Sequence, residues 1–151
     1  MRNLNRIVKV VSFIFCFSCS IALNAQKHQL NGIYQTKNGG KQIYFSSYTN
    51  KSLFIDTVQI VSFHQIKSFE VNKSNSNSKS QYLTLRLSQA VIAKFAKVTK
   101  ENFAKPLAII LKDNIISAPI VFSEISDGVI KLPFKDDTIL KELIKELNIH
   151  N

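Results

Sequence analysis

The sequence predicts an α+β fold, a mainly antiparallel sheet with two helices packed on one face. Between residues 30 and 134, short apolar or alternating stretches bounded by turn residues recur, which is typical of strands. The apolar spacing of an amphipathic helix occurs at 89–104 and at 138–148. From Tyr82 onward the predicted order is strand, helix, three strands and helix, which favours helices collected on one side of a sheet.

The N-terminus, residues 1–25, has the pattern of a signal peptide. Three basic residues precede an uncharged apolar run at 10–23, and Ala25 supplies a small residue after which a signal peptidase can cut. The run is short for a membrane-spanning helix, which needs about 20 residues. We therefore expect an exported protein of residues 26–151, periplasmic or extracellular, which is membrane-anchored if the signal is not cleaved.

Cysteine usage narrows the chemistry of the exported part. Cys16 and Cys19 both lie in the predicted signal, so cleavage leaves no thiol. Residues 26–151 then have no disulfide framework, no thiolate nucleophile and no cysteine metal site. A chain of this length can instead be held together by a hydrophobic core.

The net charge is basic. It is +10 for the whole chain, and the predicted signal holds three of the positive charges and no negative ones, which leaves +7. Such a charge favours anionic partners such as lipid head groups, acidic peptides or nucleic acid. The lysines are scattered and not packed into blocks, however, so a surface that keeps the domain in solution is the simpler interpretation.

A β-rich lead-in spans 30–72. Turn residues at 31–32 and 38–40 lie among apolar residues and indicate a hairpin, and "IKSFEV" at 66–71 alternates as a strand does. The polar stretch 72–80 predicts a flexible loop. The pieces on either side look too small to fold separately, so we expect one domain. Its N-terminal strands either extend the main sheet or make a small second layer.

The core of the domain is expected at 81–148. "QYLTLRL" at 81–87 alternates as a strand does, and Ser88 is a plausible N-cap for the helix that follows. That helix should stop near Ala104, because Pro106 restricts the residue before it. At the other end, Asp136 or Asp137 should cap the last helix.

A central hairpin is predicted at 107–120, "LAIILKDNIISAPI". The continuous apolar run 107–111 is typical of a strand covered on both faces, and Asp113-Asn114 supplies a turn. Pro119 should end the ladder, because proline has no N–H to donate. Asp127-Gly128 then turns the chain into a last strand, "VIKLPF".

Catalytic and metal-binding patterns are not apparent. The histidines His28, His64 and His150 lack metal-ligand spacing. Ser117 has no nucleophile motif around it, and its hydroxyl is expected to bond to backbone at a strand end. We therefore expect no enzymatic activity and no cofactor. Basic residues do alternate with aromatic ones in "KQIYFSSYTNK" at 41–51, but a hairpin buries some of these and export argues against nucleic acid.

Residues 83–147 resemble the first periplasmic domain of SecD, an accessory subunit of the bacterial Sec protein translocase. The resemblance lies in an apolar strand, a helix with a central Phe, Thr-x-x-Asn, Lys-x-Leu-Ala and Ser-Ala-Pro, closed by Ile-x-x-Gly. The matching residues are Phe95, Thr99, Asn102, Lys105, Leu107, Ala108, Ser117, Ala118, Pro119, Ile125 and Gly128.

The chain also departs from that family. The family usually has glycine where this chain has Asn114, and two glycines where it has Asp127-Gly128. SecD spans the membrane several times and couples export to the proton gradient, whereas no spanning segment follows the predicted signal here. The resemblance therefore implies the fold and an affinity for unfolded or extended chains, and it does not imply proton coupling.

These observations predict an exported, non-enzymatic, polypeptide-binding domain that assists protein export. An extended peptide would add as a strand to the 107–120 hairpin, reading backbone and not sequence. The expected partners are unfolded or extended polypeptide and Sec translocase components, with peripheral contact to an anionic membrane surface left open. The predicted binding residues are Ser117, Ala118, Pro119, Val121 and Gly128. The alternative is an envelope or secreted structural or inhibitory protein that reuses the fold.

Overall fold

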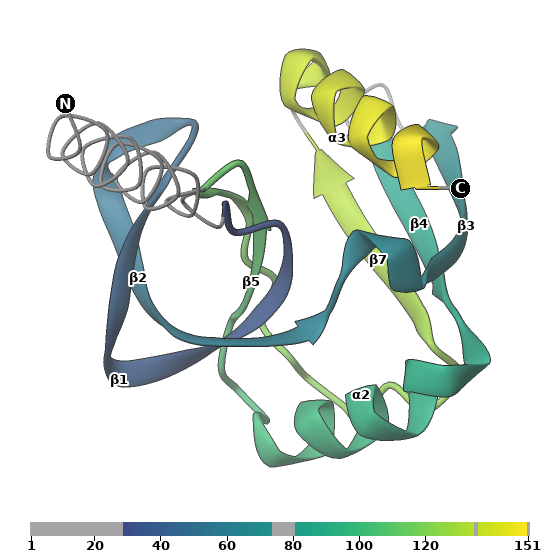
Figure 1. Ribbon diagram of the computed structural model, residues 1–151, viewed down its shortest axis with the longest axis horizontal. Coiled ribbons are helices and arrows are strands. Elements are labelled where there is room, and N and C mark those ends of the chain that lie inside the picture. The colour runs from purple at the N-terminus through teal and green to yellow at the C-terminus, as the bar shows by residue number, and fades with distance from the viewer. Residues whose placement is uncertain (1–28, 74–80, 135, 151) are drawn as a thin grey trace, which may run out of the picture.

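The computed structural model describes residues 29–73, 81–134 and 136–150. The predicted signal peptide and most of the predicted 72–80 loop lie outside these residues. The chain forms two sheets, with strand orders β2-β1-β5-β6 and β3-β4-β7 (Figure 1). The elements are β1 (Gly32–Phe45), β2 (Tyr48–Val61), η1 (Phe63–Gln65), β3 (Ile66–Lys73), β4 (Gln81–Leu87), α2 (Gln89–Glu101), β5 (Leu107–Leu111), β6 (Asn114–Ser117), β7 (Val129–Phe134) and α3 (Asp137–His150).

The α+β class is confirmed. The N-terminal strands form a second layer, one of the two arrangements left open for them, but the predicted central hairpin lies in that second sheet and not beside β4. β4 has β3 and β7 as its two neighbours, so neither of its edges is left for β5. β5 pairs with β1 instead, with Ile109 opposite Ile33. The segment predicted as a lead-in therefore supplies the partner of the central hairpin, and it forms a second layer.

β5 is buried on both faces, as its continuous apolar sequence predicts. Leu107, Ile109 and Leu111 face a large hydrophobic cluster that lies between the two sheets. Ala108 and Ile110 face a smaller cluster inside the curl of the first sheet. Because successive side chains of a strand point to opposite faces, both faces of β5 need apolar cover.

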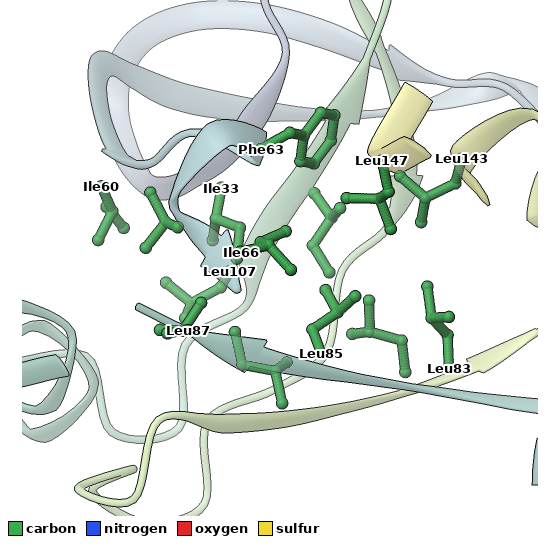
Figure 2. Packing of buried hydrophobic residues seen from close by; sticks show 14 of the residues in the cluster. Ile33, Ile60, Phe63, Ile66, Leu83, Leu85, Leu87, Leu107, Leu143 and Leu147 are labelled. Atoms are coloured by element: carbon green, nitrogen blue, oxygen red, sulfur yellow. The ribbon is translucent and has the colours of Figure 1, made fainter. Parts of the chain in front are cut away.

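The large cluster gathers both helices on one face of the β3-β4-β7 sheet. Figure 2 shows Leu143 and Leu147 of α3 facing Leu83 and Leu85 of β4. α2 adds Val91 and Phe95 to the same cluster. The predicted packing of two helices on one sheet face therefore holds for this sheet. Its cover is completed by the inner face of the other sheet, from which Ile33 and Leu107 project.

The glycines at 39 and 40 form a bulge and not the predicted hairpin tip. β1 runs on to Phe45, and both Thr36 and Lys41 lie opposite Ile55 of β2. A Cβ on Gly40 would come within 2.1 Å of the Ile55 carbonyl oxygen, so only glycine fits this close approach. The prediction was wrong because a bulge and a hairpin turn use the same glycine-rich sequence.

The turn between β5 and β6 lies one residue earlier than predicted. Lys112 (φ 50°) and Asp113 (φ 62°) are both left-handed, which makes a two-residue hairpin turn, and Asn114 already belongs to β6. Three hydrogen bonds hold this turn to the residues just before β1. Asp113 Oδ1 accepts from the Leu30 N–H (3.0 Å), the Asp113 N–H donates to the Leu30 carbonyl (3.1 Å), and the Lys112 N–H donates to Asn31 Oδ1 (2.7 Å). The absence of glycine at 114 is therefore without structural cost.

Replacing Asp113 should show how much its side chain contributes to the stability of this turn. Asp113→Ala removes the acceptor for the Leu30 N–H and leaves a left-handed alanine, so we expect a loss of about 1–3 kcal/mol of unfolding free energy. Asp113→Asn keeps a side-chain oxygen and a residue that tolerates this conformation, and it should lose less than half as much. Chemical denaturation measures both, and equal losses would contradict the assigned role of the side chain.

The hydrogen bonds show which of the two predicted residues caps the last helix. Asp136 Oδ1 accepts from the Thr138 N–H at 2.8 Å and from the Ile139 N–H at 3.4 Å, so Asp136 is the cap. Asp137 instead accepts from the Gln81 side chain at 2.8 Å. Among the described helices, none is long and apolar enough to cross a membrane.

Candidate functional site

A largely apolar cavity of about 240 Å³ lies between α2, the two sheets and the loop that joins β6 to β7. We call it the apolar groove. Phe95 of α2, Ile33 of β1 and two side chains of β5 form one part of its lining, and the loop and β7 form the other. Its lining residues are Ile33, Phe95, Leu107, Ile109, Pro119, Ile120, Val121, Phe122, Ser123, Ile125, Ile130 and Lys131.

Two of the five predicted binding residues line this groove. Pro119 and Val121 belong to its lining, and Val121 is buried. Ser117 and Ala118 are half-buried and precede the groove without lining it. Gly128 is buried at the far end of the loop, against Ile92 of α2. The structure therefore places only part of the predicted set at one site.

The edge of the predicted hairpin is partly occupied. Phe45 of β1 lies parallel to Ile115 of β6, and the Ser46 N–H donates to the Ile115 carbonyl at 3.0 Å. β6 is only four residues long, so this contact covers its centre. Strand addition to β6, as expected from the sequence, would have to displace the end of β1.

Strand β6 ends at Ser117, just before Pro119, as predicted, but an isolated antiparallel bridge follows beyond the proline. The Leu107 N–H donates to the Pro119 carbonyl (3.0 Å), and the Val121 N–H donates to the Lys105 carbonyl (3.0 Å). Proline lacks a donor, but its carbonyl still accepts. These bonds make Ile120 and Pro106 an antiparallel pair that is not directly hydrogen-bonded, so the N–H and C=O of Ile120 point away from Pro106.

The apolar surface continues out of the groove onto exposed side chains. Ile120 is 51% exposed and Phe122 is 75% exposed, and both line the groove. Neither residue was predicted from the sequence, because an isolated apolar residue in a short segment usually indicates a core position. Alternation around the buried Val121 is the signal that could have found them, since residues on either side of it point the opposite way.

The Thr99 side chain links α2 to the β6–β7 loop, which forms the outer wall of the groove. This side chain is fully buried, and its Oγ1 accepts from the Ile125 N–H at 3.0 Å. The same hydroxyl donates into the helix, where the Ala96 carbonyl lies at 2.9 Å. The resemblance included Thr99 without giving it a role, and the structure shows that it joins the helix to the loop.

We expect Thr99→Val to lower the unfolding free energy by about 1–3 kcal/mol, because it leaves the partly buried Ile125 N–H without an acceptor. Thr99→Ser keeps the hydroxyl, so it should retain most of the stability and keep the Ile125 amide protected. Chemical denaturation together with amide hydrogen exchange at Ile125 tests this pair. Fast exchange at Ile125 in both variants would show that the hydroxyl is not what holds the loop.

A second, polar cleft of about 760 Å³ lies between β1, β2 and the end of α2. At its floor, Asp56 accepts from Lys37 (3.3 Å) and Gln35 (3.4 Å), and Gln35 in turn accepts from Asn102 (3.3 Å). The Val58 backbone N–H, followed by these two side chains, lowers the pKa of Asp56. The network links α2 to β1 and β2 and satisfies these polar side chains.

Ion pairs occur at several places on the described surface. The ion pairs Lys37–Asp56, Lys100–Glu124 and Lys112–Glu142 lie on different elements, and Lys131 is the charged residue that lines the apolar groove. Within 29–73, 81–134 and 136–150, no three His, Cys, Asp or Glu side chains are grouped so that they could hold a metal ion. The chemistry of the groove is therefore that of an apolar contact surface.

Comparisons with known proteins agree on one family. Residues 40–138 match the family model of the SecDF P1 head subdomain. A solved structure of a membrane component SecDF that enhances protein export is 14% identical, with a TM-score of 0.58 over 77% of this chain and 60% of its own. SecDF in a super-membrane-facing form is also 14% identical, with a TM-score of 0.54 over 74% of this chain and 17% of its own. No curated protein matched. The chain thus spans less than two thirds of either solved protein.

Proposed function

This chain belongs to the SecDF P1 head family, and from that premise we propose that it is an exported, non-enzymatic domain that binds unfolded or extended polypeptide during protein export. The observation that carries the proposal is the apolar groove beside two exposed apolar side chains, Ile120 and Phe122. Contiguous exposed apolar surface of this kind marks interaction sites in soluble domains.

The size of the groove suits side chains of a polypeptide better than a whole small molecule. Its 240 Å³ is below the range of about 300–1,000 Å³ that small-molecule pockets occupy. One or two apolar side chains of a chain that continues across the surface would fill it. Ile120 and Phe122 would then cover the neighbouring part of that chain.

The lining of the groove supports a binding role without catalysis. Its hydrogen-bonding side chains are Ser123 and Lys131, and its other lining side chains are apolar. Acyl or phosphoryl transfer needs a nucleophile beside a base that is itself oriented. A site that only recognises apolar side chains needs neither.

The partners follow from the family and from the charge distribution. A solved relative is described as enhancing protein export, so the ligand we propose is an emerging exported chain, with Sec translocase components as neighbours. The lysines are scattered along the sequence, which favours polypeptide over an anionic membrane surface, because such a surface is bound best by clustered positive charge.

Binding of a permanently unfolded protein, reduced and alkylated, tests this function against the same protein in its native form. We expect the purified chain to bind the unfolded form and to ignore the native one at physiological salt. Binding that disappears between low and physiological salt would mean that charge and not the groove is responsible. Equal binding of both forms, or of neither, would contradict the proposal and favour a structural or inhibitory role in the envelope.

A further inference from the structure

The free edge of β7 borders the apolar groove. Among the described strands, β7 is an outer strand of its sheet and pairs with β4 alone. Ile130 and Lys131 of β7 line the groove. The backbone at this edge therefore lies next to the apolar contact surface.

The register of the sheet determines which backbone groups of β7 face the groove side. The Leu87 N–H donates to the Gly128 carbonyl at 2.9 Å, whereas the next amide, Ser88, donates the other way, to Gln65 at 2.8 Å. Bonds in an antiparallel ladder alternate in this manner. Ile130 and Leu132 therefore bond to β4. The N–H and C=O groups of the residues that alternate with them point outward, away from β4. The outward residues of β7 are Val129, Lys131 and Pro133.

Two of these three positions cannot donate to an incoming strand. The Val129 N–H already donates to Asp127 Oδ1 at 3.0 Å. Pro133 has no N–H, which is how proteins commonly protect an edge strand. Lys131 lies between them with its N–H and C=O directed outward, and its strand position is opposite Thr84, away from any ladder bond to β4. On both sides of Lys131, the outward residue that lines the groove, the edge therefore has no N–H to donate to an added strand.

The opposite wall of the groove offers similar groups. Ile120 also lines the groove, and its N–H and C=O point away from Pro106. Both walls therefore combine apolar side chains with backbone groups that a ligand backbone could satisfy. A peptide in extended conformation carries both kinds of complement, because its side chains alternate in direction and its backbone groups point sideways.

We propose that the ligand binds as an added β-strand on β7, with its backbone paired to Lys131 and its alternate apolar side chains in the groove. This inference rests on the proposed function and specifies how the polypeptide is held. It transfers strand addition from the predicted hairpin, whose β6 edge is partly occupied, to the second sheet. Recognition by backbone makes binding tolerant of sequence, provided that apolar residues recur at every second position.

The comparison of Lys131→Pro with Lys131→Ala tests the backbone contact directly. Pro133 shows that β7 accommodates proline at an outward position, so the ladder to β4 should survive Lys131→Pro. The probe is a short fluorescent peptide in which valine alternates with serine. Both variants lack the lysine side chain, so their difference reports the backbone alone, and we expect Lys131→Pro to bind the peptide about fivefold more weakly than Lys131→Ala, as loss of one hydrogen bond predicts.

A measurement on the unmodified protein guards against misfolding of the proline variant. Saturating peptide should slow hydrogen exchange at the Lys131 amide. Exchange at the amide of Lys67, which lies on β3 at the other edge of the same sheet, should stay unchanged. Unchanged exchange at Lys131, or equal affinities of the two variants, would overturn strand addition while leaving groove binding in place. Failure of the unmodified protein to bind any unfolded chain would instead contradict the proposed function itself.

Discussion

The double variant Ile120→Ser and Phe122→Ser should bind an unfolded polypeptide at least about tenfold more weakly than the unmodified protein, since each exposed apolar side chain contributes about 1 kcal/mol or more to such a contact. Its unfolding midpoint in denaturant should hardly change, because the two side chains are 51% and 75% exposed in the folded protein. Fluorescence anisotropy with a labelled unfolded protein measures the affinity.

Phe54→Ser is the matched control for this double variant. Phe54 is 49% exposed, so its substitution removes exposed apolar surface comparable to that at Ile120 alone, and it lies on β2 beside the polar cleft and away from the apolar groove. The control should bind as the unmodified protein does. An equal loss in the control would mean that apolar surface anywhere on the domain supports binding, and the groove would no longer be the site.

Gly128→Val should lower the unfolding free energy by about 3 kcal/mol or more, which combines a left-handed β-branched residue with overpacking. Gly128 has φ +67°, and an added Cβ would lie 2.7 Å from Ile92 Cγ1 and 2.9 Å from Ile92 Cδ1. Its carbonyl also accepts from the Leu87 N–H, so a displaced backbone would disturb the sheet. Gly128, predicted from sequence as a binding residue, is therefore expected to act through the fold.

Gly39→Val separates the cost of the left-handed conformation from the cost of overpacking. Gly39 has a similar φ of +71°, but nothing lies within 4 Å of its added Cβ, so this variant should lose only the conformational part, about 1–2 kcal/mol. Adding Ile92→Ala to Gly128→Val should recover part of the loss, because it empties the space that the valine needs. Chemical denaturation of the variants decides the matter. Equal losses at 39 and 128 would show that the contact with Ile92 is unimportant.

Local patterns predicted the elements that depend on their own sequence. The alternation at 81–87 predicted strand β4, and the apolar spacing after Ser88 predicted helix α2. The continuous run 107–111 correctly indicated a strand covered on both faces. Each of these signals is a property of neighbouring residues and needs no knowledge of what lies across the core.

Pairing between distant segments could not be predicted in this way. β1 and β5 are joined by a register that sets Ile33 opposite Ile109, and no local pattern specifies a partner so far along the chain. The turn at Lys112 and Asp113 has the same origin. Neither residue type favours two successive left-handed conformations, and the contacts that hold the turn come from Leu30 and Asn31.

The candidate site was likewise predicted only in part from the sequence. Pro119 and Val121 were found because the resemblance included their segment, and both line the groove. Ile120 and Phe122 were missed, because sequence alone does not separate an exposed apolar residue from a buried one. Lys131 was missed for another reason: its role depends on which of its backbone groups β4 leaves unpaired, and only the register of the sheet reveals that.

Photo-crosslinking in living cells from a reactive amino acid at position 122, compared with the same group at position 54, tests the central claim most directly. If the groove receives exported chains, position 122 should capture many unrelated exported polypeptides, with Sec translocase components among the products, and position 54 should capture few. Capture of a single dedicated envelope protein, of lipid alone, or of the same products from both positions would contradict the assignment of the groove as a polypeptide-binding site.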